Sequence, residues 1–330
     1  MFRIEICGGD YKFLKIIGKG GFGKVYEVED VLGIRAAVKV VKDEKLARNE
    51  YKILQILEGV KGVPRVFRFY DKETSFALSM ELGGLCIIDP ESGIDFKNIY
   101  VLADFAWKSI EILKNIHRRG IVHNDIKPHQ FLISENRKIF LVDFGFSRRF
   151  KNGKFHKELK VLDKKQGNFL FASKNCHKGY SLSRRDDLIS LGYMLIYLYK
   201  GALPWESCGN INNPADKWDK AYGIKKMKSV ASLCKGMPSE FSKFLEYSIS
   251  LEYSKKPDYR YLISIFKDLS ALFSSKSNTN STNASSSSFS TKDIGLTQTY
   301  FQLAETEVID APEFKLRVQV DIENPVSIML

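Results

Sequence analysis

The sequence lacks paired cysteines, a long apolar run and a charge of one sign spread evenly along the chain. Its five cysteines are scattered and never form a CxxC pair, which argues against a secreted disulfide framework and a structural zinc site. They are Cys7, Cys86, Cys176, Cys208 and Cys234. The longest apolar stretch, 188–199, is interrupted by Gly192 and is shorter than the ~20 residues of a membrane span, so it predicts a buried core helix. Residues 1–11 hold no apolar run typical of a signal peptide. These absences predict a soluble protein of the cytoplasm, the nucleus or both.

The charge of the chain is uneven. The net charge is +12, yet residues 293–330 hold seven acids and two bases, a net −5. The preceding residues therefore carry +17, and such a body attracts acidic proteins, nucleic acid or anionic membranes. The alternative is that this charge mainly keeps the protein in solution.

Apolar spacing predicts strands early in the chain and helices later. Residues 11–42 alternate apolar runs with turn residues, typical of consecutive antiparallel strands, and 77–82 read as a short strand before Gly83–Gly84. Helical spacing covers four stretches: 44–58, 97–119, 184–200 and 238–251. We therefore expect an α+β protein with two lobes joined at 82–84.

The last part of the chain differs in composition. Residues 274–290 are almost entirely Ser, Thr and Asn, which cannot bury enough apolar surface to offset their ordering entropy, so we expect a disordered linker. Residues 314–322 alternate like a strand, but the sequence offers no obvious partner.

A glycine-rich stretch lies among the predicted strands. Residues 18–25, GKGGFGKV, fit G-x-G-x-x-G-x-V with Gly18, Gly20, Gly23 and Val25 at the defined positions. Glycines let a backbone approach phosphates and point N–H groups at them. A dinucleotide-binding loop would open a helix, whereas strand alternation follows here, and the Gly-Lys-Ser/Thr of a P-loop is absent. A glycine hairpin over phosphates is the protein kinase arrangement.

Charged residues follow this hairpin in the order that phosphoryl transfer requires. Lys39, on a strand, can reach the α- and β-phosphates of ATP, and Glu50 can hold it by an ion pair. Asp125 stands where a carboxylate accepts the proton of a substrate hydroxyl, and Lys127 can neutralise the moving phosphoryl group. Asp143, in Asp-Phe-Gly, can ligate Mg²⁺. Singly these are surface charges or turn caps, but their order together predicts a kinase.

From about Tyr11 to Leu272 the chain resembles the casein kinase 1 family of serine/threonine kinases. The stretch 167–175, GNFLFASKN, resembles the family's GTARYASIN, which replaces the usual Ala-Pro-Glu. Other motifs of the family lie at 183–188 (SRRDDL), 190–193 (SLGY), 203–205 (LPW), 234–241 (CKGMPSEF) and 256–259 (KPDY).

The resemblance implies a two-lobed protein kinase fold over residues 1–273, with a β-rich lobe to about 82 and a mainly helical lobe from 83. A linker over 274–292 and an acidic tail over 293–330 would follow. ATP would lie between the lobes, with Met80 as gatekeeper and Glu81 and Leu82 at the hinge facing adenine. Asp187 would bind the catalytic-loop backbone, and His123 would pack beneath the Asp-Phe-Gly turn. Family members are active without phosphorylation of the activation segment and favour acidic or pre-phosphorylated proteins.

This chain departs from the family pattern in its catalytic loop and activation segment. Asn124 replaces an arginine that can pair with a phosphorylated activation segment. Gln130 replaces the second metal-binding asparagine, and its extra methylene moves the amide oxygen by roughly 1.5 Å, although Mg²⁺ demands near-ideal geometry. Leu170 aligns with a phosphate-reading arginine and Asn168 with its neighbouring threonine, so primed substrates lose that contact.

The stretch 148–178 is strongly basic, with only Glu158 and Asp163 as acids. Its bases are Arg148, Arg149, Lys151, Lys154, Lys157, Lys160, Lys164, Lys165, Lys174 and Lys178. Because this segment borders the peptide site of kinases, we expect acidic peptides to be favoured. The alternative is a merely solvated basic face.

The sequence thus predicts a monomeric Ser/Thr protein kinase that uses ATP and Mg²⁺, acts on protein substrates and neither inserts into membranes nor binds nucleic acid. Gln130 motivates the alternative of a pseudokinase or weak kinase that acts as a binding scaffold. A nucleic-acid-binding protein rests only on the basic body, without a zinc module or RNA-binding motif. The acidic tail suggests a pseudosubstrate that folds onto the basic groove, and the alternative is a passive tail.

Overall fold

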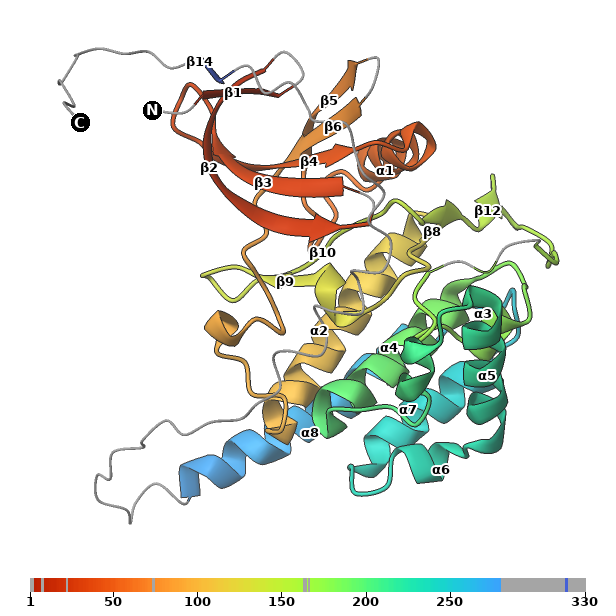
Figure 1. The fold of residues 1–330 in the computed structure, drawn as a ribbon. Coiled ribbons are helices and arrows are strands. Elements are labelled where there is room, and N and C mark those ends of the chain that lie inside the picture. The colour runs from red at the N-terminus through yellow and green to blue at the C-terminus, as the bar shows by residue number, and fades with distance from the viewer. Residues whose placement is uncertain are drawn as a thin grey trace.

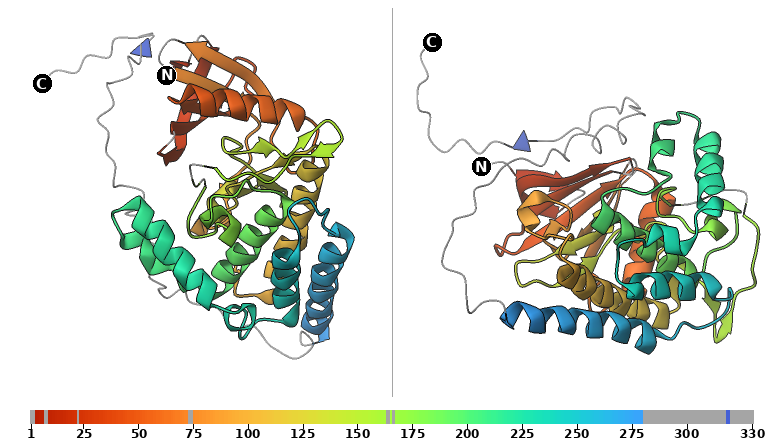
Figure 2. Two further views of the ribbon diagram at one scale, coloured as in Figure 1. Left: turned by 90° about the vertical axis from the view of Figure 1, so that its right-hand side faces the viewer. Right: turned by 90° about the horizontal axis from the view of Figure 1, so that it is seen from below.

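The computed structural model describes residues 3–6, 9–21, 23–72, 75–162, 165, 167–279 and 318–319. A β-rich lobe lies at one end and a helical lobe at the other, as Figures 1 and 2 show from three directions. The chain passes between them at residues 81–84, directly after the strand that ends at Met80. The predicted α+β, two-lobed architecture is confirmed.

The first lobe is built on one antiparallel sheet whose strands pair in the order β14-β1-β2-β3-β4-β6-β5. Its strands are β1 (Arg3–Ile6), β2 (Gly9–Gly20), β3 (Gly23–Glu29), β4 (Arg35–Val41), β5 (Val66–Lys72), β6 (Ser75–Met80) and β14 (Val318–Gln319). The strands predicted within 11–42 are confirmed as β2, β3 and β4. Short β14 falls within the strand predicted over 314–322, and its partner is β1.

Strand register places the expected nucleotide-binding residues in line across the sheet. Gly18 is paired with Val25 in the β2–β3 hairpin, and Val25 is paired with Lys39 on β4. Two residues earlier on β4, Ala37 is paired with Met80 at the end of β6. Because neighbouring strands lie about 4.8 Å apart, this register gathers the glycine hairpin, the lysine and the expected gatekeeper.

Helix α1 (Glu44–Ile56) packs against this sheet and confirms the helix predicted over 44–58. Asp43 begins it, since its Oδ1 accepts the backbone N–H of Leu46 at 3.0 Å. The helix buries Ile53 and Leu54 in the same face that carries Glu50. The apolar periodicity that predicted the helix therefore also directs Glu50 toward the interior.

The second lobe is mainly helical. Its helices are α2 (Ile99–Arg118), α3 (Lys174–His177), α4 (Arg184–Lys200), α5 (Pro214–Met227), α6 (Val230–Leu233), α7 (Ser239–Ser250) and α8 (Tyr259–Thr279), with 3₁₀ turns η1 (Pro90–Ser92), η2 (Pro128–Gln130) and η3 (Glu206–Asn210). Helices α2, α4 and α7 confirm the predicted ones within two residues. Helix α4 is buried on most sides, as its apolar run predicted. Among the described residues, no helix is long and apolar enough to cross a membrane.

Helix α8 continues to Thr279, past the expected end of the kinase domain at residue 273. Polar residues can extend an existing helix because propagation avoids the cost of a new nucleus. The remainder of the expected linker, residues 280–292, lies outside the described part of the chain.

Short strands between the lobes hold the loops that carry the predicted catalytic residues. Strand β8 (Ile121–Val122) pairs with β11 (Arg148–Arg149), and β9 (Phe131–Ile133) lies between β7 (Leu85–Cys86) and β10 (Ile139–Leu141). A hairpin of β12 (Lys151–Asn152) and β13 (Phe155–His156) follows. The loop of Asp125 therefore runs from β8 to β9, and Asp143 comes two residues after β10.

Candidate active site

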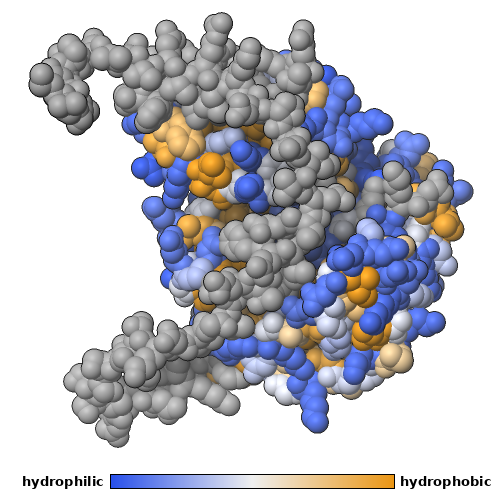
Figure 3. Space-filling model, viewed as in Figure 1, coloured by the Kyte–Doolittle hydropathy of each residue, from blue (hydrophilic) through white to orange (hydrophobic). Residues whose placement is uncertain are grey.

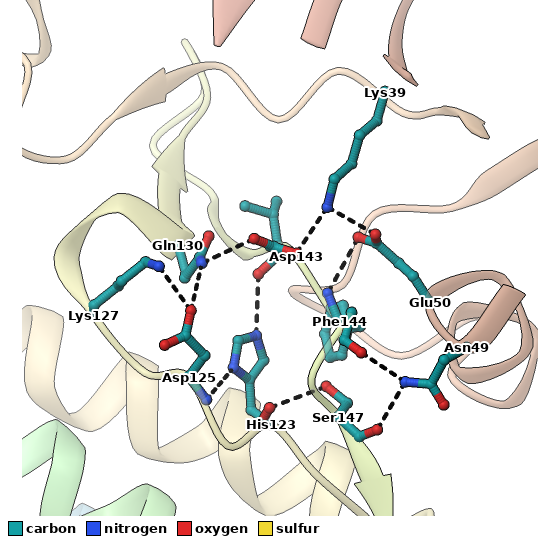
Figure 4. Close-up of polar contacts among 12 residues, drawn as sticks. Lys39, Asn49, Glu50, His123, Asp125, Lys127, Gln130, Asp143, Phe144 and Ser147 are labelled. Atoms are coloured by element: carbon teal, nitrogen blue, oxygen red, sulfur yellow. Dashed lines mark hydrogen bonds and ion pairs between the residues drawn. The ribbon is translucent and has the colours of Figure 1, made fainter. Parts of the chain in front are cut away.

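Lys39 connects three separate elements at the centre of the site (Figure 4). Its Nζ lies 2.7 Å from Glu50 Oε2 on α1 and 2.7 Å from Asp143 Oδ1 after β10. Burial alone would lower the pKa of Lys39, but the two carboxylates outweigh it and raise that pKa. Burial works against ionised Asp143 too, yet Lys39 outweighs it and holds the pKa of Asp143 well below its usual range. The predicted Lys39–Glu50 ion pair is therefore present, with Asp143 ionised beside it.

The Asp-Phe-Gly turn is fixed from two sides. The Phe144 N–H donates to Glu50 Oε1 at 3.2 Å, and its fully buried ring lies 5.0 Å from the ring of His123. His123 Nε2 donates to the Val142 carbonyl at 3.0 Å, which confirms its predicted packing role. On the other side Asn49 Nδ2 donates to the carbonyls of Gly145 (2.8 Å) and Ser147 (3.0 Å), a contact that the sequence did not predict.

The two carboxylate oxygens of Asp125 differ in their hydrogen-bond partners. The residue is only 4% exposed, and its Oδ2 accepts from Lys127 Nζ at 2.7 Å and from Gln130 Nε2 at 3.1 Å. Its Oδ1 has no hydrogen-bond partner among the described residues. A buried acceptor without a partner is unfavourable, so Oδ1 is suited to receive a hydroxyl from an incoming molecule.

Gln130 spans the two aspartates, because its Nε2 also donates to Asp143 Oδ2 at 3.1 Å. The longer side chain thus reaches the carboxylate with which it was expected to share a metal ion. Magnesium prefers oxygen ligands and commonly combines one or two protein groups with phosphate oxygens and water. Ionised Asp143 supplies one such oxygen, whereas Gln130 directs its Nε2 at both aspartates, so its amide would have to turn to offer Oε1 to a metal ion. No cluster of three or more His, Cys, Asp or Glu that could hold a metal ion occurs within the described ranges.

Asp187, on α4, binds the catalytic-loop backbone as the family resemblance implied. Its Oδ2 accepts the His123 N–H and its Oδ1 the Asn124 N–H, both at 2.8 Å, and His117 Nε2 lies 2.8 Å from Oδ2. Asn124 has φ +69°, in the left-handed region that asparagine tolerates better than most residues. Its Nδ2 donates to the Phe146 carbonyl at 3.0 Å. The residue that replaces the family's arginine therefore links the catalytic loop to the Asp-Phe-Gly segment.

The expected hinge residues lie where β6 ends. Met80 is buried and Leu82 is half-buried. The Glu81 N–H donates to the Arg65 carbonyl at 2.8 Å, and Glu81 Oε2 accepts the Arg65 N–H at 3.1 Å. A Cβ on Gly83 would lie 2.7 Å from the Leu132 side chain, so the hinge runs close to β9. Figure 3 shows hydrophobic residues at the recessed edge between the lobes, within a mainly hydrophilic surface.

The glycine stretch forms the β2–β3 hairpin and not the start of a helix, as predicted. Gly20 is paired with Gly23 at its tip, and a Cβ on Gly23 would lie 1.9 Å from the Val40 carbonyl oxygen. No heavy atom would lie within 4 Å of a Cβ on Gly20. Strand pairing thus requires Gly23, whereas Gly20 leaves the backbone open to a ligand.

The activation segment approaches Asp125 at Gly167, which the sequence did not single out for this role. Gly167 has φ +82°, and a Cβ there would lie 2.5 Å from the Asn124 carbonyl oxygen and 3.3 Å from Asp125 Oδ1. Leu170 is 5% exposed, in the core, and its carbonyl accepts from Trp205 Nε1 at 2.6 Å. The apolar side chain in place of the family's arginine is therefore used for packing.

The structure brings Lys39, Glu50, Asp125, Lys127, Gln130 and Asp143 into one contact network. Strand register places Lys39 of this network beside Val25 of the glycine hairpin. A comparison with known protein families matches the protein kinase domain over residues 11–264. This range contains every residue of the network. Since the match covers most of the chain, the chain belongs to the protein kinase family.

Proposed function

We propose that this protein kinase is a divergent casein kinase 1-like enzyme that transfers the γ-phosphate of Mg-ATP to serine or threonine hydroxyls of acidic proteins. The observation that carries the proposal is the asymmetry of Asp125. Lys127 and Gln130 hold one carboxylate oxygen, and the other has no partner among the described residues.

In the proposed mechanism the side chains orient the reactants and stabilise charge. Lys39, fixed by Glu50, binds the α- and β-phosphates, and the open glycine hairpin covers them. Asp125 Oδ1 accepts the hydroxyl proton and aims the oxygen at the γ-phosphorus. Lys127 neutralises charge on the transferred group. Asp143, with Gln130 turned to present its Oε1, would hold Mg²⁺, and the ion would neutralise charge on the phosphates.

Serine/threonine specificity rests on the resemblance to casein kinase 1 and on the geometry around Asp125. Lys127 and Gln130 approach Asp125 on its Oδ2 side, while Gly167 lies toward Oδ1. A Cβ at Gly167 would enter this space, so glycine leaves room for a short hydroxyl side chain. Leu170 cannot pair with a phosphate, and we therefore propose acidic rather than primed substrates.

A preference for acidic substrates is supported by exposed bases on the activation segment. Five bases between β11 and the residues just after β13 are exposed: Arg148, Arg149, Lys154, Lys157 and Lys160. Lys165 is partly neutralised, because its Nζ lies 2.6 Å from Asp219. Lys164 lies outside the described residues. Clustered like charge attracts acidic peptides in a way that added salt weakens.

The test is a peptide panel in which serine, threonine or tyrosine is the acceptor, in acidic or neutral surroundings, across a salt series. We expect the acidic serine and threonine peptides to be phosphorylated fastest, with an advantage that declines as salt rises. The double variant Lys154→Gln/Lys157→Gln should lose part of this advantage, and Lys220→Gln, an exposed lysine of α5, should not. Equal turnover of acidic and neutral peptides at low salt would remove the acidic preference, and faster tyrosine transfer would remove the Ser/Thr assignment.

Gln130 also motivated the alternative of a pseudokinase. The contacts of Lys39, Glu50, Asp125 and Asp143 favour the enzyme, because each predicted catalytic group lies in hydrogen-bond reach of the next. The absence of phosphate transfer to any peptide of the panel, with normal ATP binding, would favour the scaffold instead.

A further inference from the structure

Helix α5 carries a lysine whose charged end lies inside the protein. Lys225, in the last turn of α5, is 1% exposed, a rare situation for lysine. Its Nζ donates to the carbonyls of Phe169 and Ala172, each at 2.7 Å, and contacts His177 Nε2 at 3.0 Å. Both carbonyls belong to the end of the activation segment, far from α5 in sequence.

The three partners of Lys225 suit an amine in its charged form, with the neighbouring His177 ring neutral. Carbonyl oxygens only accept, and His177 Nδ1 donates to the Trp218 carbonyl at 2.9 Å, so Nε2 of that neutral ring must also accept. Three acceptors require the three N–H groups that only the charged form has. The rings of Tyr193 and Trp205 lie 5.3 and 4.9 Å from Nζ and add cation–π attraction. Burial lowers the pKa of Lys225, and these five contacts oppose it.

Further contacts fasten the same stretch of backbone to the helical lobe. The Leu170 carbonyl accepts from Trp205 Nε1 at 2.6 Å. Ser173 Oγ and Asn175 Nδ2 donate to Asp186 Oδ1 on α4, at 2.6 and 2.9 Å. Within the described part of the chain, Lys225 alone contacts two carbonyls of residues 169–172 through one atom.

The fastened loop begins beside the proposed catalytic base. Gly167 lies two residues before residues 169–172, and a Cβ there would lie 3.3 Å from Asp125 Oδ1. A displacement of residues 169–172 therefore alters the space in which a peptide hydroxyl meets Asp125. The Lys39–Glu50–Asp143 contacts involve no residue of this loop.

We propose that Lys225 is a positioning residue for the peptide substrate, whose buried ammonium holds the backbone of residues 169–172 in the peptide-accepting conformation beside Asp125. The inference rests on the proposed transfer of phosphate to protein hydroxyls. It assigns to α5 a role that catalytic-loop motifs do not include.

The test compares the full chain with Lys225→Met, which keeps the length of the side chain and removes its donors, and with Lys220→Met as the matched control on the exposed face of α5. We expect peptide kcat/KM to fall about 10- to 100-fold in Lys225→Met, since small misplacements near the reacting atoms cost this much. The KM for ATP should stay within about twofold, and Lys220→Met should match the wild type. Equal losses for peptide and ATP, or an unchanged peptide kcat/KM, would overturn the proposal.

Hydrogen exchange separates this proposal from the proposed function, because it needs no activity. In Lys225→Met the amides of residues 168–173 should exchange at least about tenfold faster, while those of α4 keep their protection. Uniform loss of protection across the helical lobe would show a general packing role and contradict the proposal. Should Lys225→Met fail to fold, Lys225→Gln removes the charge and shortens the side chain while it stays polar, and the same two measurements apply with the same outcomes.

Discussion

Replacing His177 with glutamine should make the protein less sensitive to acid. Burial first, and the neighbouring Lys225 ammonium second, lower the pKa of His177 to about 3. Its ring accepts from Lys225 at Nε2 and donates to the Trp218 carbonyl at Nδ1, so protonation of Nε2 would abolish the first contact. Glutamine can present an amide oxygen near the position of Nε2 and has no proton to gain in this range.

The size of the effect follows from the two pKa values. In the unfolded chain His177 takes up a proton near pH 6.5, whereas in the folded chain it does so only near pH 3. The unfolded state therefore binds more protons between these values, and stability falls as the pH decreases through this window. From about pH 7.5 to about pH 5 the loss amounts to about 2 kcal/mol.

Urea unfolding at a series of pH values measures this directly. The wild type and His177→Gln share every other titrating group, so the difference between their unfolding free energies isolates residue 177. That difference should be flat above about pH 7.5 and should change by about 2 kcal/mol in favour of the variant by about pH 5. Parallel stability curves across the whole range would refute the buried, neutral state of His177.

Two other substitutions test the geometry around the catalytic loop. Gly167→Ala should lower peptide kcat more than tenfold, because its Cβ would meet the Asn124 carbonyl and Asp125 Oδ1. The control is Gly153→Ala, which has φ +57° and open space around its Cβ, so it carries only backbone strain and should keep its kcat. Equal kcat in the two alanine variants would show that the space between Gly167 and Asp125 does not affect catalysis. Asp187→Asn should lower both kcat and the unfolding free energy, the latter by about 1–3 kcal/mol, because an amide N–H₂ would face a backbone N–H. Both quantities are measured on the same variant, kcat by peptide phosphorylation and stability by urea unfolding. A wild-type kcat would show that the catalytic loop keeps its position without the Asp187 carboxylate.

Local patterns predicted much of the fold. The strands within 11–42 and helix α1 follow from apolar spacing along short stretches, and the glycine hairpin was distinguished from a helix start by the alternation after it. Helix α5 was not predicted, and its burial explains why. The buried residues of α5 are Ala221 and Lys225, so the helix shows no apolar stripe to detect.

The candidate site was predictable in its residue types and not in its supporting contacts. Lys39, Asp125 and Asp143 stand in motifs of fixed order, so their chemistry was readable from the sequence. Asn49 meets the carbonyls of Gly145 and Ser147 from almost a hundred residues away, and no spacing rule connects such positions. No spacing rule connects Lys225 with Phe169 and Ala172 either, because these contacts depend on how α5 packs against the activation segment.

The most direct test of the proposed mechanism is transfer of the γ-phosphate of radiolabelled ATP to an acidic serine peptide by the wild type, Asp125→Asn and Asp216→Asn, the last being an exposed aspartate of α5. We expect transfer by the wild type and Asp216→Asn, a loss of at least about 100-fold in Asp125→Asn, and ATP affinity within about twofold in all three. Transfer by Asp125→Asn at the wild-type rate would contradict the assignment of Asp125 as the residue that receives the substrate hydroxyl.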